Sequence, residues 1–191
     1  MRGLRIDAST LVMLDRLILL LLTMILSAIL TAAMVMQFAL ADIPCPLCLL
    51  QRVAMFGCCF GLLHQLRARE SERGGGIALL FALLLLVIAT RQTLLDLFPR
   101  PGHAYIGSAV FGVHMEVWSV VIGVSLLLAL ALRLTLFGSP RTLPQAERPP
   151  FARAVRLLEF YVVLICVLNF ASVVLQCGLG ECHTSGYRLL T

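Results

Sequence analysis

Residues 17–38 read LILLLLTMILSAILTAAMVMQF, an apolar run long enough to cross a bilayer as a helix. After the break ALADIPCP at 39–46, similar runs cover 47–66, 77–98, 113–137 and 157–176. Open strands cannot satisfy their backbone groups in lipid, so we expect every span to be helical. The expected fold class is an all-α integral membrane protein, with a four-helix transmembrane bundle and a fifth C-terminal transmembrane helix.

The composition excludes an ordinary soluble domain. The chain has 191 residues, of which 60% are hydrophobic and only 13% are charged, whereas soluble domains carry about 25% charged residues. The net charge of +5 does not indicate nucleic-acid binding. The arginines lie beside the apolar segments, as signals of membrane topology do, and the partner that this pattern predicts is the lipid bilayer.

The distribution of arginines predicts the orientation in the membrane. Eleven of the fifteen basic residues, all arginines, fall on the side of the N-terminus, and four fall on the other side. Cytoplasmic segments are enriched in basic residues. The N-terminus is therefore expected in the cytoplasm, and the C-terminus, after five crossings, on the outer face.

The connections divide the chain into three predicted parts. Residues 1–137 form the four-helix membrane domain, 138–156 a proline-rich cytoplasmic linker, and 157–191 the fifth helix with a cysteine-containing outer tail. The stretch from Ser71 to Gly76, which ends in three glycines, predicts a cytoplasmic turn between the second and third spans.

A pair of cysteines at the start of the second span predicts redox chemistry. Cys45 and Cys48 are two residues apart, and Pro46 between them is tolerated at the first position of a helix. A thiolate in the first helical turn is stabilised by the helix dipole. Arg52 follows Cys48 by one turn, with Gln51 beside it, and an arginine at the lipid boundary needs a partner. A thiolate or the oxygen of a reduced electron carrier would be a suitable partner for this arginine.

A second pair of cysteines follows the fifth span. Cys177 and Cys182 enclose two glycines, which allow the tight reversal that a disulfide requires. This pair is either a structural clasp or a relay that exchanges with Cys45 and Cys48. The four outer cysteines together with His183 would alternatively provide zinc ligands, although we expect no metal.

The third and fourth spans contribute further polar candidates. Arg91 is either an interfacial arginine or, with Gln92, part of a carrier pocket. His114 and Glu116 either anchor a loop or take part in proton transfer. Three cysteines inside spans are expected to be small buried apolar side chains: Cys58, Cys59 and Cys166.

The motif resembles that of the bacterial disulfide-bond formation protein B family, DsbB. Its pattern Pro-Cys-x-Leu-Cys-x-x-x-Arg is matched by Pro44, Cys45, Leu47, Cys48 and Arg52. The stretches at 92–99 and 111–118 are similar to the family's end of helix three and start of helix four. The resemblance covers about residues 15 to 137.

The resemblance implies an enzyme of the bacterial inner membrane that reoxidises a periplasmic thioredoxin-fold dithiol protein of the DsbA type. Electrons would pass through the cysteine pair to ubiquinone or menaquinone. Cys48 would be the thiolate that meets the quinone, Arg52 would bind a quinone oxygen, and Cys45 would exchange with the second disulfide.

The chain departs from the family pattern at two points, in a way that resembles the DsbI-like branch. The family's second cysteine pair lies between helices three and four, where this chain has none, and this chain continues into a fifth span. We expect Cys177 and Cys182 to replace the missing pair. A vitamin-K-epoxide-reductase-like enzyme, a metal-binding membrane protein and a structural membrane protein are the alternatives.

Overall fold

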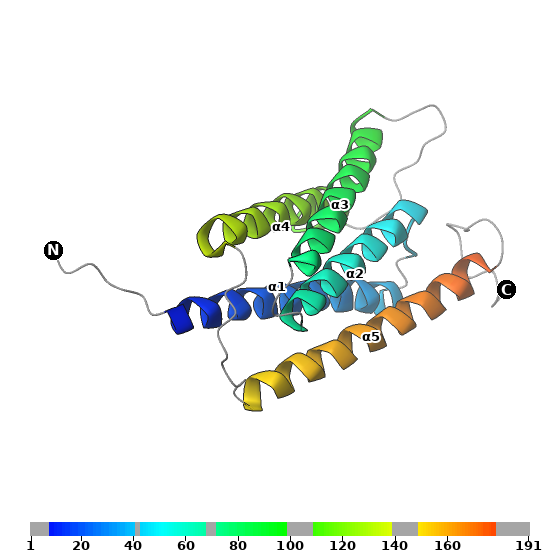
Figure 1. Ribbon diagram of the computed structural model, residues 1–191. Helices are drawn as coiled ribbons and strands as arrows, with labels where there is room; N and C mark the ends of the chain where they lie inside the picture. Colours follow the sequence, from blue (N-terminus) through cyan, green and yellow to red (C-terminus); the bar gives the residue numbers. More distant parts are fainter. Residues whose placement is uncertain (1–7, 41–42, 68–71, 99–108, 139–148, 179–191) are drawn as a thin grey trace.

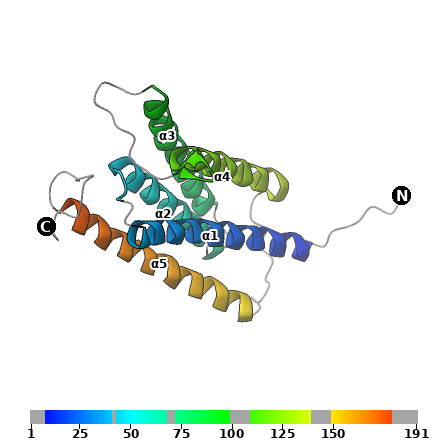
Figure 2. The ribbon, with the colours of Figure 1, turned by 180° about the vertical axis from the view of Figure 1, so that it is seen from behind.

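The computed structural model describes residues 8–40, 43–67, 72–98, 109–138 and 149–178. The predicted site residue Cys182 and the possible ligand His183 lie outside these ranges. The elements, shown from opposite sides in Figures 1 and 2, are α1 (Ala8–Ala39), α2 (Pro46–Arg67), α3 (Arg73–Leu97), β1 (Ala109–Val110), β2 (Val113–His114), α4 (Met115–Phe137) and α5 (Pro149–Cys177).

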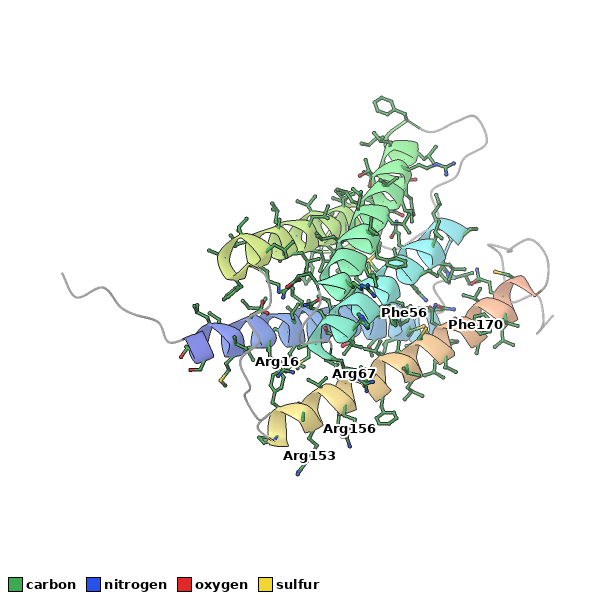
Figure 3. The ribbon with its side chains drawn as sticks, viewed as in Figure 1. Arg16, Phe56, Arg67, Arg153, Arg156 and Phe170 are labelled. Atoms are coloured by element: carbon green, nitrogen blue, oxygen red, sulfur yellow. The ribbon has the colours of Figure 1, made fainter. Side chains whose placement is uncertain are left out.

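All five helices are long and apolar enough to cross a membrane. Their outward faces carry large apolar side chains, including Leu80 on α3 and Phe160 on α5, which are 70% and 69% exposed. Figure 3 shows such side chains around the bundle. Apolar side chains on the outside are stable in lipid, and the expected fold class, an all-helical membrane bundle with a fifth helix, is confirmed.

Two glycines let α2 and α3 approach each other closely. A Cβ atom added to Gly61 would lie 2.5 Å from the backbone nitrogen of Ala78, and one added to Gly74 would lie 2.4 Å from that of Gln65. The predicted turn over residues 71–76 is therefore wrong in its second half, because α3 begins at Arg73. Gly74 serves helix packing, as small residues do in membrane bundles.

The buried face of α3 continues this contact along the helix. Ala78, Ala82, Leu85 and Ala89 are all fully buried, and Gln92 follows them on the same face. On α2, the predicted burial of Cys58 and Cys59 is confirmed. For Cys166 the prediction is wrong, because this side chain lies on an exposed face of α5.

Ionic contacts join the helices at the end of the bundle where α1 begins. Arg133 of α4 is 3% exposed and binds Asp15 of α1, with a 2.6 Å contact from Nε to Oδ1, and Glu72 before α3, at 3.1 Å. Nearby, Arg67 pairs with Glu159 of α5. Figure 3 shows Arg16, Arg67, Arg153 and Arg156 at this end. The fold therefore brings together arginines that are far apart in the sequence.

Helices α1 and α5 begin well before the expected apolar spans. Helix α1 starts at Ala8, although the expected span starts at residue 17, and α5 starts at Pro149 rather than at residue 157. Proline is favoured in the first turn of a helix because its missing N–H needs no partner there. The helix thus extends into the segment expected to be a linker, and the division into three parts stays a prediction.

The close contact between α2 and α3 gives a prediction about stability. Gly61→Val should lower the midpoint of thermal unfolding in detergent, followed by circular dichroism, because its side chain would collide with backbone rather than with a movable side chain. Overpacking of this kind costs about 1–3 kcal/mol. Gly76→Ala is the matched control, since a Cβ atom there meets nothing within 4 Å. Equal midpoints for both variants would show that the contact is unimportant.

Candidate redox site

Cys45 and Cys48 lie at the start of α2 and are locked together by the backbone. Cys45 directly precedes Pro46, the first helical residue, and its Sγ accepts a hydrogen bond from the backbone N–H of Cys48 at 3.1 Å. Its carbonyl accepts the N–H of Leu49 at 3.1 Å. The Cys45 sulfur thus satisfies one of the free N–H groups of the first turn, as a capping side chain does. Both cysteines are partly buried free thiols.

The side-chain amide of Gln92 connects the two sulfurs to α3 and α4. Its Nε2 lies 3.4 Å from the Sγ atoms of both Cys45 and Cys48, and 2.9 Å from Oε1 of Glu116. Its Oε1 accepts a hydrogen bond from Gln51 Nε2 at 2.9 Å, which fixes the orientation of the amide. An N–H group aimed at two sulfurs stabilises negative charge on either of them.

The two thiols are chemically different. The hydrogen bond of its side chain with Cys48, together with burial, raises the pKa of the Cys45 thiol well above its usual range. Cys45 therefore keeps its proton in the dithiol form, and its S–H can donate to the Cys48 sulfur. In a CxxC pair this difference separates the thiol that reacts from the one that needs a base.

Arg52 points to the other side of α2. Its Nη1 donates to Oε1 of Gln37 on α1 at 2.6 Å and to Oδ1 of Asn169 on α5 at 3.2 Å. Its Nη2 donates to the carbonyl of Ala33 at 3.1 Å. Arg52 is 8% exposed, and these contacts offset most of the cost of burying its charge. Sequence reasoning missed Asn169, because its contact with Arg52 joins residues that are 117 positions apart on different helices.

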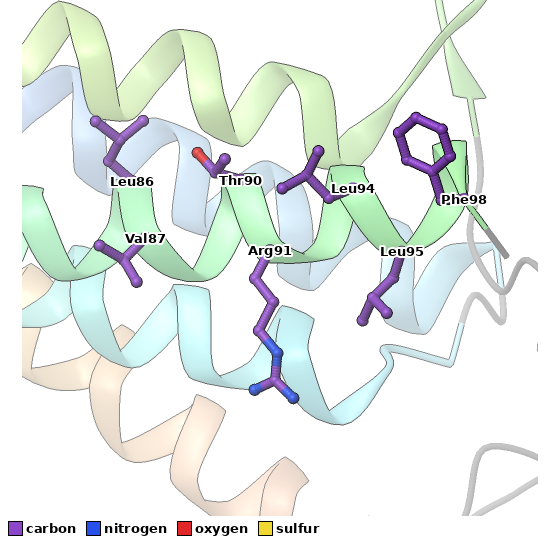
Figure 4. A pocket seen from close by; sticks show the side chains of 7 residues that line it. All are labelled: Leu86, Val87, Thr90, Arg91, Leu94, Leu95 and Phe98. Carbon is purple, nitrogen blue, oxygen red and sulfur yellow. The ribbon is translucent and has the colours of Figure 1, made fainter. Parts of the chain in front are cut away.

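Arg91 lies apart from the thiols and from the contacts of Arg52, on an exposed face of α3. It lines a groove of about 780 Å³ whose other lining residues are Leu86, Val87, Thr90, Leu94, Leu95 and Phe98. In Figure 4 its side chain reaches from α3 toward α2. The four residues predicted to bind a carrier are therefore divided: Gln51 and Gln92 contact each other beside the thiols, whereas Arg52 and Arg91 lie on different faces.

The end of α5 lies beside the start of α2. Gln176 is fully buried, and its Nε2 donates to the carbonyl of Pro44, the residue before Cys45, at 2.8 Å. The next residue, Cys177, is 5% exposed and disulfide-bonded. The hydrogen bond therefore joins the residue before Cys177 to the residue before Cys45, across 132 positions of sequence.

A short hairpin fixes the start of α4. Phe111 and Gly112, with φ of 54° and 74°, turn the chain between β1 and β2, and such positive angles suit a two-residue hairpin. Trp118 Nε1 donates to the carbonyl of Val110 at 3.1 Å and ties the helix to the hairpin. Glu116, in the first turn of α4, is thereby held against Gln92.

The comparison with protein families agrees with the motif. Residues 15–105 match the family model described as "Disulfide bond formation protein DsbB". No curated protein and no solved structure matches the chain. The matched stretch contains both cysteines of the first pair, Gln51, Arg52 and Gln92. The resemblance to DsbB is thus confirmed over these residues, which match the model of the family of disulfide-bond formation proteins.

Proposed function

We propose that the protein is a quinone-dependent thiol:disulfide oxidoreductase of the bacterial inner membrane. It would reoxidise a periplasmic thioredoxin-fold protein of the DsbA type and pass the electrons to ubiquinone or menaquinone. The observation that carries the proposal is the position of Cys45 and Cys48 at the start of a membrane helix, with one amide nitrogen of Gln92 within 3.4 Å of both sulfurs. The family match over residues 15–105 supports the same chemistry.

On the partner side, electrons would enter through thiol–disulfide exchange. The hydrogen bond from Gln176 to Pro44 holds the end of α5 beside Cys45 and supports exchange between the disulfide of Cys177 and the first pair. A thiolate attacks one sulfur of a disulfide and releases the other, so each transfer conserves two electrons. The proposed order is partner dithiol, Cys177–Cys182, Cys45–Cys48 and then quinone.

On the membrane side, the residues present fit a quinone. The groove beside Arg91 is lined by five apolar side chains and opens on the lipid face of α3, as an isoprenoid tail requires. Arg91 or Arg52 would donate to a carbonyl oxygen of the ring, and Cys48 would be the sulfur that faces it. A bound quinone supplies the oxidising power to remake a disulfide able to oxidise a partner near about −120 mV.

The proposed orientation places the cysteines on the oxidising side of the membrane. The arginines Arg16, Arg67, Arg153 and Arg156 gather at one end of the bundle, and Cys45, Cys48 and Cys177 lie where α2 begins and α5 ends. With the arginine-rich end in the cytoplasm, the N-terminus is cytoplasmic, and the thiols face the periplasm, where disulfides persist.

The alternative function as a metal-binding membrane protein gains no support from the geometry. Within the ranges that the structure describes, no three His, Cys, Asp or Glu side chains lie close enough together to hold a metal ion. A purely structural role leaves unexplained why the buried amide of Gln92 faces two free thiols.

The proposed function is tested by replacing Cys48. Membranes containing the wild-type chain and a quinone should oxidise a reduced thioredoxin-fold substrate, followed by thiol alkylation and gel shift, and Cys48→Ser should abolish this activity because the sulfur that delivers electrons is gone. Cys166→Ser is the matched control, since Cys166 is a free thiol on an exposed face of α5. Full activity of Cys48→Ser would refute the oxidoreductase function.

The two alternative roles of Cys177–Cys182, an electron relay and a structural clasp, predict different results when both cysteines are replaced. If Cys177–Cys182 carries electrons, the double replacement by Ser should stop oxidation of the protein substrate, while dithiothreitol, which can reach Cys45–Cys48 directly, should still reduce the quinone. If the pair is only a clasp, both substrates should be oxidised at the wild-type rate. The measurement is the ratio of the two rates in the same membranes.

The quinone site is tested by comparing two arginines. Because Arg52 and Arg91 lie on different faces, only the arginine that donates to the ring oxygen should, when replaced by Gln, raise the KM for quinone, by about tenfold, since a hydrogen bond to a charged group contributes about 1.5–3 kcal/mol. Arg67→Gln is the control, since Arg67 pairs with Glu159 in an exposed ion pair at the far end of the bundle. An unchanged KM for either variant removes that arginine from the quinone site.

A further inference from the structure

Glu116 is a buried carboxyl group that the proposed electron route does not use. It is 2% exposed, and its Oε1 accepts the hydrogen bond from Gln92 Nε2 at 2.9 Å. Its Oε2 is fully enclosed and has no hydrogen-bond partner in the described part of the chain. A buried oxygen without a partner is costly and calls for a chemical reason.

The position of Glu116 relative to the thiols suggests that reason. Gln92 Nε2 lies within hydrogen-bonding range of Glu116 and of both sulfurs, so a single amide nitrogen separates the carboxyl group from the cysteine pair. A base at this separation can take up a proton through one water molecule. Since Gln92 occupies Oε1, the unpartnered Oε2 is the oxygen available to receive it.

Oxidation of the dithiol releases protons as well as electrons. When the Cys45–Cys48 disulfide forms, two S–H protons are lost, one S–S bond is made, and two electrons leave. The raised pKa of Cys45 means that this thiol does not lose its proton unaided. The electron route through Cys48 therefore requires a base near Cys45.

We propose that Glu116 is this base and accepts the proton of the Cys45 thiol as the disulfide forms, a role that rests on the proposed function. The S–H bond of Cys45 breaks, the proton passes to the Glu116 carboxylate, and the electron pair left on Cys45 forms the bond to Cys48. The S–H bond of Cys48 also breaks, and the electron pair that it leaves on Cys48 passes to the quinone. The proton on Glu116 and the one from Cys48 then supply the two that hydroquinone formation consumes, and Glu116 is again a carboxylate.

A purely positional role for Glu116 is the competing explanation, in which the carboxylate only holds the Gln92 amide. Glu116→Gln separates the two roles. The variant keeps a carbonyl oxygen that can accept the hydrogen bond from Gln92 Nε2, and it keeps the size of the side chain. It removes only the ability to take up a proton and the negative charge.

The other ionisable groups near this site are few. Cys45 and Cys48 face Glu116 across Gln92. Arg91 and Asp96 are the charged residues of α3 nearest to Gln92 in sequence, and His114 is the titratable residue of β2, two positions before Glu116. A change in pH dependence that is caused by Glu116 must therefore persist in Asp96→Asn and His114→Gln backgrounds.

The test uses the full-length protein in detergent, after its cysteines have been reduced and the reductant removed. The protein is mixed with a short-chain ubiquinone, and a single turnover is monitored by the absorbance of the quinone. Glu116→Gln should slow disulfide formation by about 100-fold or more, the usual loss when a general base is removed. If a carboxylate must accept the proton, the wild-type rate should fall at acidic pH and the rate of Glu116→Gln should not. Glu116→Asp should restore part of the rate, and Glu159→Gln at the far end should match the wild type.

A second readout needs no quinone. The rate at which iodoacetamide alkylates Cys45, measured by mass spectrometry, should rise in Glu116→Gln, because removal of a nearby negative charge favours the thiolate. Slower oxidation with faster alkylation separates the two roles when the thermal midpoint of Glu116→Gln equals that of the wild type, since a misfolded site would also expose the partly buried Cys45. A wild-type oxidation rate in Glu116→Gln would overturn the role of Glu116, whereas failure of the wild-type protein to reduce quinone would overturn the proposed function itself.

Discussion

The close contact between α2 and α3 is the constraint on which the redox site depends. Gly61 and Gly74 allow the two backbones to meet, and the small side chains of Ala78, Ala82 and Ala89 keep them together along α3. Lipid gives helices no hydrophobic reason to associate, so tight backbone packing is the main attraction between them. The same buried face of α3 ends at Gln92, which is how an uncharged amide comes to lie beside two thiols.

Three helices contribute different chemical groups to the site. Helix α2 carries the cysteines, α3 supplies the amide that faces both sulfurs, and α4 supplies a buried carboxyl group behind that amide. Helix α5 adds contacts on the opposite side of α2, from Asn169 to Arg52 and from Gln176 to Pro44. The fifth helix lies outside the stretch that matches the DsbB family, yet it is built into the surroundings of the motif.

Sequence reasoning located the helices well, but it placed several side chains wrongly. It found all five membrane helices and the CxxC pair at the start of the second one, because apolar length and the cysteine spacing are local properties. It read Gly74 to Gly76 as a turn, since glycine breaks isolated helices, whereas tertiary contact uses Gly74 as a packing surface. It expected Cys166 to be buried, although a membrane helix exposes its apolar face to lipid.

By itself, the sequence determined that the chain crosses a membrane as helices, and it predicted a redox role for Cys45 and Cys48 from their spacing at the start of one of them. Apolar length and a two-residue spacing suffice for both, because each depends on neighbouring residues only. The tertiary structure decided which polar groups surround the pair: Gln92 on the sulfurs, Glu116 behind it, and Asn169 on Arg52. These contacts join residues 24 to 117 positions apart, and only the packing of the helices brings them together.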